Sequence, residues 1–441
     1  MATSKKIKLG RCSKSEISYD TLPHEQVVIL HDYTSYYGPT AALNDNTPLQ
    51  FDVTNAGSDF IDPSDMYLKM KVKITKANGD NLASTDKVAP VNHIGAAMFS
   101  QFDFVMNNAV ISQPTNMHHY KSYLHHLTNL PLDVKNTMLF MEGWHSDQAG
   151  SFDDAGNTGF VERAKRFALS KEVELKVKLH TDLGFQQKLI PNKVHIRITL
   201  TRAKNAFCLQ SHDTVDTQNP QEQYKLTITH AELQVRKVRL EPGCQLEIER
   251  RILHGSGAHF PINHIVMKCF NIPTGSSTHS IDSLFEGQRP NVTVMGLVPN
   301  ENFNGTWPST PWNFQHHNVN FLELNIDGQP VPSHPLQPDY AGDKYMDAYE
   351  TLYRGRLMLG TESTHGIKYG DYKNGNCLYI FNLTADKSDG MGLATRPFGQ
   401  VNVALRFTSP TTETLTLVVF AEFSNIITIF GDRQVAFDYA R

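Results

Sequence analysis

The chain has 441 residues, of which 40% are hydrophobic and 10% aromatic, so it is long enough for two to four domains with real cores. It has 41 lysines and arginines and 45 acidic residues, which give a net charge of -4. This charge excludes a protein that attracts nucleic acid or anionic lipid through the electric field of the whole molecule. Five scattered cysteines without a C-x-x-C pair argue against a disulfide scaffold or zinc ribbon and favour a reducing compartment.

The N-terminal residues contain no apolar stretch typical of a secretory signal, and no run of residues is long and apolar enough to span a bilayer. We therefore expect a protein made in soluble form in the cytoplasm or nucleus. Residues 1–20 form a basic arm that is either a solubilising tail or a contact to nucleic acid or another anionic inner surface. Its positive charges are Lys5, Lys6, Lys8, Arg11 and Lys14.

Strand patterns dominate the chain. Between Met66 and Ile74 apolar and polar residues alternate, and the alternation ends at the turn pair Asn78-Gly79. From 224 to 240 the alternation changes phase near His230, which predicts a bulge. In the second half, strands are expected at 262–270, 292–298, 321–326, 378–383, 401–407, 415–420 and 426–430.

The stretch 171–209 contains two strictly alternating runs, 174–179 and 194–200, joined by a connection with turn residues and apolar side chains. The pattern predicts an antiparallel unit of two strands with a packed connection. We expect Asp182, Phe185 and Pro191 to fix the geometry of this connection.

Short helical segments are expected at 117–130 and 345–357. The first contains four histidines, His118, His119, His125 and His126. Histidines that chelate a metal from one helix usually sit four residues apart, and the residues four after His118 and His119 are a serine and a tyrosine. The spacing therefore favours a polar or interfacial helix face over a metal site.

Motifs for catalysis or cofactor binding are absent from the sequence. There is no nucleophile elbow, phosphate loop, H-E-x-x-H pair or dinucleotide-binding turn. Residues 141–165 are rich in Gly, Asp, Ser and Asn and are expected to form a long surface loop with solvated carboxylates. We predict a structural or binding protein that is not an enzyme and that uses no cofactor, metal or small-molecule substrate.

The order of features repeats in the two halves of the chain. Residues 99–111 match 319–331, and each match is followed by one of the helical segments with tyrosines; residues 193–200 match 400–407. The repeat predicts an all-β protein of two consecutive jelly-roll β-sandwiches, a double jelly roll, with short helices and long loops. A pair of unrelated sandwiches is the alternative. The expected divisions are 21–243 for the first jelly roll, 244–258 for a linker and 259–441 for the second.

Three segments resemble a known family. LHTDLGFQQKLIPNKVHIRITLTRAKNAFCL (179–209) is similar to a strand and connection in the double jelly-roll major capsid proteins, or hexons, of Polinton (Maverick) elements and adintoviruses. TPLQFDVTNAGSDFIDPSDMYLKMKVKI (47–74) resembles their opening strands, and LTLVVFAEFSNIITIFGDRQVAFDYAR (415–441) their closing segment. The segments occur in the same order, and the resemblance covers about residues 20–441.

The resemblance implies a homotrimer that forms a pseudo-hexagonal capsomer and tiles an icosahedral shell in the virion. Partners would be neighbouring capsomers, penton and minor capsid proteins, and packaged DNA through the basic arm. Subunit contacts are expected in the helical segments and in the loops at 141–165, 299–318 and 333–375, although the loop at 299–318 could equally fold onto its own domain. The residues expected at subunit contacts are Trp307, Trp312, Tyr120, Tyr123, Tyr345 and Tyr349.

Two other classes of protein remain as alternatives. A β-sandwich carbohydrate-binding or hydrolase protein would need aromatic platforms beside acids, and three tryptophans are few for that. A minor capsid or penton protein would need only one jelly roll. If several of the 20 histidines lie between subunits, their protonation near pH 6 would weaken a shell.

Overall fold

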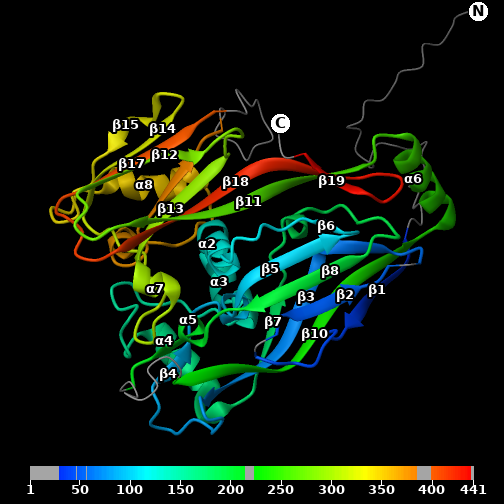
Figure 1. Cartoon of the computed structure of the whole chain (residues 1–441), viewed down its shortest axis with the longest axis horizontal. Coiled ribbons are helices and arrows are strands. Elements are labelled where there is room, and N and C mark those ends of the chain that lie inside the picture. Colours follow the sequence, from blue (N-terminus) through cyan, green and yellow to red (C-terminus); the bar gives the residue numbers. More distant parts are fainter. Residues whose placement is uncertain (1–28, 46, 56, 214–222, 385–398, 439–441) are drawn as a thin grey trace, which may run out of the picture.

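The computed structural model describes residues 29–45, 47–55, 57–213, 223–384 and 399–438 of the chain. It contains two antiparallel β-sandwiches side by side, and helix α2 (His118–Asn129) lies between them (Figure 1). Each sandwich, called a barrel below, consists of two sheets that pack face to face on a core of apolar side chains.

The first barrel is built from residues before position 241. One sheet has the order β1-β10-β3-β7, with β1 (Ile29–Tyr37), β10 (Tyr224–Leu240), β3 (Phe60–Lys76) and β7 (Val173–Lys178). The facing sheet has the order β2-β8-β5-β6, with β2 (Leu49–Val53), β8 (Ile196–Arg202), β5 (Phe99–Met106) and β6 (Ala109–Val110). A short extra pair is formed by β4 (Val88–Pro90) and β9 (Leu209–Ser211).

The second barrel repeats this arrangement strand for strand. Its sheets have the orders β11-β18-β13-β16 and β12-β17-β14-β15, and β19 (Val435–Asp438) adds to the edge of β18. The strands are β11 (Ala258–Ile272), β18 (Leu415–Ile429), β13 (Val292–Pro299), β16 (Leu378–Asn382), β12 (Thr278–Phe285), β17 (Val401–Phe407), β14 (Val319–Ile326) and β15 (Gln329–Leu336). The sequence repeat pairs 99–111 with β14–β15 and 193–200 with β17, and in the structure these segments occupy equivalent places.

The helices are short insertions between strands. Those of the first barrel are α1 (Ile94–Ala97), α2, α3 (Leu132–Asn136), α4 (Thr158–Phe167) and α5 (Asn205–Cys208), with 3-10 turns η2 (Met138–Glu142), η3 (Ala168–Ser170) and η4 (Asp182–Phe185). Those of the second are α7 (Asn300–Asn304), α8 (Met346–Gly355) and α9 (Tyr369–Lys373). None of the helices in the described ranges combines the length and the apolar character needed to cross a membrane.

Alternation along the strands explains how each sheet acquires a buried face. In β3, Met66, Leu68, Met70, Val72 and Ile74 are all buried while the intervening lysines face outward. The predicted phase change near His230 is confirmed as a bulge, since the register of β10 against β3 shifts between Ile228 and His230.

The expected pairing of the two strands in 171–209 is wrong. β7 pairs with β3 in one sheet, whereas β8 pairs with β2 and β5 in the facing sheet. Both strands bury one face, as the alternation requires, but they bury it from opposite sides of the same core. The connection between them therefore crosses from one sheet to the other.

Three other segments differ from the expected elements. The residues expected as two strands at 415–420 and 426–430 form one strand, β18, and the segment expected as a linker consists largely of a helix, α6 (Pro242–His254). The sequence pattern did not predict β15, which contains three prolines. β15 is an edge strand, so a proline without an N–H can face solvent there without the loss of a hydrogen bond between strands.

Candidate functional site

The two barrels meet through aromatic side chains around Trp312, in the segment between α7 and β14. The Trp312 indole stacks on the Tyr123 ring of α2, with ring centroids 4.1 Å apart and an interplanar angle of 8°. Tyr120, one turn earlier on α2, meets the indole edge-on at 5.1 Å. The Trp312 Nε1–H donates to the carbonyl oxygen of Asn92 at 3.0 Å, so the polar atom of this fully buried side chain is satisfied.

Four of the residues predicted at subunit contacts make contacts within the chain instead. They are Trp307, Trp312, Tyr120 and Tyr123. Trp312, Tyr120 and Tyr123 are almost completely buried within the chain, and they leave no area for a second copy. Trp307 is also buried; its ring lies against Tyr224 of the first barrel, and its carbonyl oxygen accepts the Ser211 N–H at 2.7 Å. The loop at 299–318 thus folds onto the neighbouring barrel of the same chain.

Tyr345 and Tyr349 are also used within the chain. Tyr345 is buried and stacks on Tyr369, with centroids 4.2 Å apart. Half-buried Tyr349 donates from its hydroxyl to the carbonyl oxygen of Ile367 at 3.1 Å. These contacts hold the segment around α9 against α8, because Tyr369 and Ile367 both lie in that segment.

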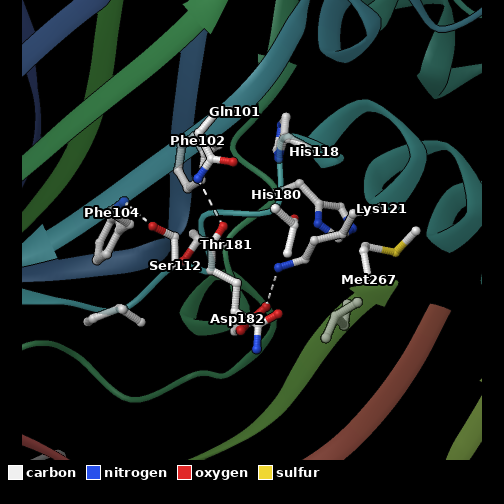
Figure 2. Close-up of a pocket in the computed structure, with 14 residues that line it drawn as sticks. Gln101, Phe102, Phe104, Ser112, His118, Lys121, His180, Thr181, Asp182 and Met267 are labelled. Atoms are coloured by element: carbon white, nitrogen blue, oxygen red, sulfur yellow. Dashed lines mark hydrogen bonds and ion pairs between the residues drawn. The ribbon is translucent and has the colours of Figure 1, made fainter. Parts of the chain in front are cut away.

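Asp182, predicted to fix the connection after β7, joins the two barrels, and Figure 2 shows its contact with Lys121. Its carboxylate accepts a hydrogen bond from Lys121 Nζ of α2 and contacts His264 Nδ1 of β11, each at 2.7 Å. Burial alone would raise the pKa of Asp182, but Lys121 and His264 outweigh it and hold that pKa below its ordinary value. The carboxylate is therefore charged at neutral pH.

A small cavity of about 30 Å³ lies beside this bridge. Its lining comes from both barrels and includes Phe102, His118 and His180 from the first and Met267 from the second (Figure 2). A volume of this size accommodates a water molecule or two, whereas small-molecule sites are about ten times larger or more. The cavity is a packing gap at the interface of the barrels.

The other two residues predicted to shape the connection, Pro191 and Phe185, contact different neighbours. Pro191 is buried, next to Ile190, whose N–H donates to Ile61 of β3 and whose carbonyl oxygen accepts from Ile61 in return. Phe185 is half exposed and packs against the rings of His125 and His180. Their role in setting the path of the connection stays a prediction.

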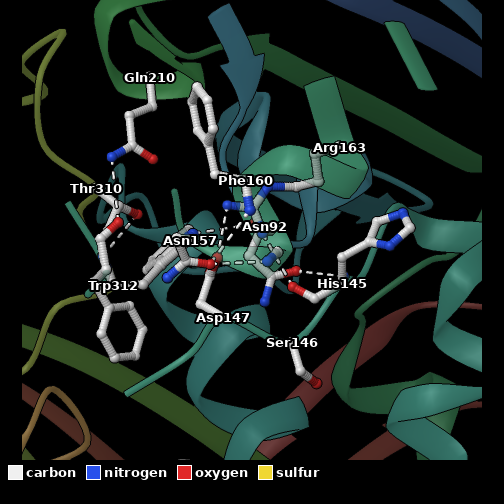
Figure 3. Close-up of polar contacts among 12 residues, drawn as sticks. Asn92, His145, Ser146, Asp147, Asn157, Phe160, Arg163, Gln210, Thr310 and Trp312 are labelled. Carbon is white, nitrogen blue, oxygen red and sulfur yellow. Dashed lines mark hydrogen bonds and ion pairs between the residues drawn. The ribbon is translucent and has the colours of Figure 1, made fainter. Parts of the chain in front are cut away.

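Residues 141–165 are an ordered part of the first barrel. Arg163 of α4 is buried, and its guanidinium donates to the carbonyl oxygens of Pro90 and His145 and to Asp147 (Figure 3). The Arg163–Asp147 ion pair is 2.8 Å long and both side chains are at most 2% exposed. A buried pair of this kind is favourable only with further hydrogen bonds, which the two carbonyl groups supply.

The same segment also bonds to the second barrel. Asp153 accepts the Thr310 N–H at 2.8 Å and the Asn313 side-chain amide at 2.7 Å. Gln210 donates to the carbonyl oxygens of Phe152 and Pro308, which lie in different barrels. Composition predicted a solvated loop here, but its polar groups join two parts of the chain.

The histidines of α2 lie inside the chain. His118 stacks on Phe102, and His119 stacks on Phe207 with centroids 4.1 Å apart. Burial lowers the pKa of both, that of His119 to about 3, because an imidazolium would lose its hydration. At neutral pH these rings are uncharged.

Exposed apolar side chains gather in the helical insertions. Four lie in α3 and η2 and are called the α3–η2 surface: Leu132, Met138, Phe140 and Met141. At the corresponding place in the second barrel, around and after α8, Met346, Leu357 and Leu359 are also exposed. The basic arm with Lys5, Lys6, Lys8, Arg11 and Lys14 lies outside the described residues.

No protein-family model matches the chain. Uncharacterized protein F54H12.2 of Caenorhabditis elegans is 23% identical over 422 residues, which cover 92% of this chain and 97% of that protein. The chain therefore has a relative of nearly the same extent.

Solved structures of viral capsids have the same fold. A chain of the Sputnik virophage structure aligns with a TM-score of 0.64 at 11% identity, covering 98% of this chain and 93% of the other. The PBCV-1 virus capsid gives 0.60 at 10% identity (96% and 100% covered), and the mavirus major capsid protein 0.52 at 12% identity (98% and 96% covered). At these identities the likeness establishes the fold, and the predicted double jelly roll is confirmed.

Removing the indole of Trp312 should loosen the contact between the barrels. We expect Trp312→Ala to lower the free energy of unfolding by about 3–5 kcal/mol, because a buried aromatic group and its hydrogen bond are lost. Urea unfolding measures the change. Phe185→Ala, at a half-exposed ring, is the control and should cost much less; equal losses for the two variants would contradict the assignment.

Neutralising Asp182 should also destabilise the chain. Asp182→Asn keeps the shape but leaves Lys121 without its counter-ion, and breaking a buried pair costs about 3–5 kcal/mol. The matched control is Asp52→Asn, which removes an exposed ion pair with Arg197 and should change the unfolding free energy by less than about 1 kcal/mol. A loss below that level for Asp182→Asn would show that the bridge contributes little.

Acid should destabilise the chain through its buried histidines. The pKa of His119 is about 3 when folded and near 6.5 when unfolded, so its contribution is complete above pH 6.5 and declines as the pH falls toward 3. The decline is about 1.4 kcal/mol per pH unit. Unfolding free energies of wild type and His119→Gln, measured between roughly pH 6 and pH 4, should differ in slope by about this amount; parallel slopes would contradict it.

Proposed function

We propose that the chain is a major capsid protein, a structural protein that assembles into trimeric pseudo-hexagonal capsomers. The observation that carries the proposal is the pair of equivalent barrels, held against each other in the same fold as viral capsid proteins. Threefold symmetry applied to such a chain produces six similar wedges around one axis. The resulting hexagonal outline tiles an icosahedral shell.

The helical insertions supply suitable contact surfaces for this ring. Each barrel exposes apolar side chains at equivalent positions, on the α3–η2 surface and around α8. In a closed trimer the first barrel of one subunit lies beside the second barrel of the next, and the α3–η2 surface, which adjoins residues 364–366 of its own chain, would be covered at this contact. We therefore propose that the exposed apolar residues of the α3–η2 surface and around α8 form the subunit contacts, in place of the buried tryptophans and tyrosines.

The finer parts of the proposal rest on the sequence. The resemblance of residues 179–209 supports assignment to the Polinton and adintovirus type. The proposed partners are neighbouring capsomers, penton and minor capsid proteins, and packaged DNA through the basic arm. The proposed location is the virion, after synthesis in the host cytoplasm and with assembly there or in the nucleus.

The solution mass tests the trimer. Purified protein should have about three times the 49.6 kDa mass of one chain by light scattering, or form larger particles. Met138→Lys combined with Met141→Lys places charge on the α3–η2 surface and should shift the mass to that of a monomer with unchanged thermal stability. Leu246→Lys, on the exposed face of α6, is the control and should remain trimeric.

A wild-type monomer would contradict the proposal, and a monomer that binds immobilised glycans would favour the carbohydrate-binding alternative. One observation already disfavours that alternative. The three tryptophans, Trp144, Trp307 and Trp312, are each at most 5% exposed, so none offers a platform for a sugar ring.

A further inference from the structure

A cluster of two histidines and one acid lies in the first barrel, next to the elements that contact Trp312 of the second. His93 precedes α1, His126 lies near the end of α2, and Glu142 ends η2. The three side chains are 0%, 7% and 4% exposed, and they offer ligand atoms within 4.8 Å of one another. Residues far apart in sequence thus bring two imidazoles and a carboxylate into one buried space.

The polar atoms that face this space lack ordinary partners. His93 Nδ1 and Glu142 Oε2 are buried and accept or donate no hydrogen bond within the described part of the chain. They lie 3.6 Å apart, and His126 Nδ1 lies 3.9 Å from the same carboxylate oxygen, both beyond hydrogen-bond length. Unpaired buried polar atoms are costly and rare, so a cluster of them calls for a bound group.

Neighbouring contacts orient these atoms toward one another. The main-chain N–H of Lys178 donates to the other carboxylate oxygen of Glu142 at 3.1 Å, and His93 Nε2 lies 2.9 Å from Ser122 Oγ and 3.0 Å from His126 Nδ1. With the His93 proton on Nε2 and donated to Ser122 Oγ, the lone pairs of His93 Nδ1 and Glu142 Oε2 face the same space, and metal binding would require His126 Nδ1 to exchange its contact with His93 for the ion. Contacts that fix the orientation of a ligand in this way are typical of metal sites.

An ion pair is a poor alternative explanation of the cluster. Both contacts between an imidazole and Glu142 exceed hydrogen-bond length, at 3.6 and 3.9 Å, so neither histidine makes a short ion pair with the carboxylate. A cation would satisfy the two unpaired atoms, His93 Nδ1 and Glu142 Oε2, with His126 Nδ1, 3.9 Å from the carboxylate, as the third donor.

We propose that His93, His126 and Glu142 bind a structural divalent metal ion, with Zn²⁺ as the preferred occupant. Two imidazoles and a carboxylate form a donor set that suits zinc. Tetrahedral zinc with bonds of about 2.0–2.1 Å holds its ligand atoms about 3.4 Å apart, close to the separations seen here.

The ion would tie together the segments of the first barrel that carry the exposed α3–η2 surface. Glu142 directly follows Met141 of that surface, while His93 and His126 belong to the packed elements beneath it. The spacing of histidines on α2 alone did not predict this site, because only one of its ligands belongs to α2. Binding would raise the stability of the folded chain, since a site assembled from three segments does not exist in the unfolded state.

Metal content tests the proposal directly. Full-length protein, incubated with excess ZnCl₂ and desalted, should retain about one zinc ion per chain by elemental mass spectrometry. Glu142→Gln and His93→Gln should retain little, while His119→Gln, which removes another buried histidine of the same region, should retain as much as wild type. Zinc should raise the melting temperature of wild type and His119→Gln only.

Cobalt keeps the proposal testable even if the ligand variants fail to fold. Wild-type protein loaded with Co²⁺ should show the visible absorption bands of a tetrahedral ion with nitrogen and oxygen ligands, and added zinc should abolish them. Wild-type protein that retains no zinc, shows no such bands and melts at the same temperature with and without zinc would overturn the proposal. So would folded Glu142→Gln and His93→Gln variants with full zinc content.

Discussion

The stacking of Trp312 on Tyr123 is the contact on which the arrangement of the two barrels depends. Two domains joined by a short helical segment generally move relative to each other unless a large apolar interface holds them. Here an indole from the second barrel is buried on α2 of the first, and the Asp182–His264 contact and the Asp153 hydrogen bonds flank it. Both barrels consequently share one continuous core, which would give the proposed capsid building block the fixed shape that tiling requires.

Much of the fold could be predicted from the sequence, because alternating apolar residues identify strands with one buried face. The repeat of 99–111 at 319–331 likewise predicted two equivalent barrels. Strand partners could not be predicted in the same way: alternation shows that β7 and β8 each bury a face, but both sheets of a sandwich bury theirs against the same core. The contact between the barrels could not be predicted for a related reason. An aromatic residue in a polar loop indicates that its side chain is buried, but the sequence does not show which segment packs on it.

Polar residues were harder still to place. The composition of residues 141–165 indicated a solvated loop, yet Arg163 and Asp147 are buried there as a hydrogen-bonded pair. The histidines of α2 likewise looked like a polar helix face, but they line the interior, where burial keeps them uncharged. Burial of ionisable groups depends on partners from distant segments, such as Pro90 for Arg163 and Phe207 for His119, and no local pattern records those partners.

Capsomer assembly is the central claim, and a cryo-EM reconstruction of the purified oligomer tests it most directly. The expected map has threefold symmetry and six barrel densities around the axis, with Trp312 enclosed between the two barrels of each subunit and the α3–η2 surface at the boundary between subunits. A reconstruction with a different symmetry, or with the α3–η2 surface facing solvent in the assembled particle, would contradict the claim.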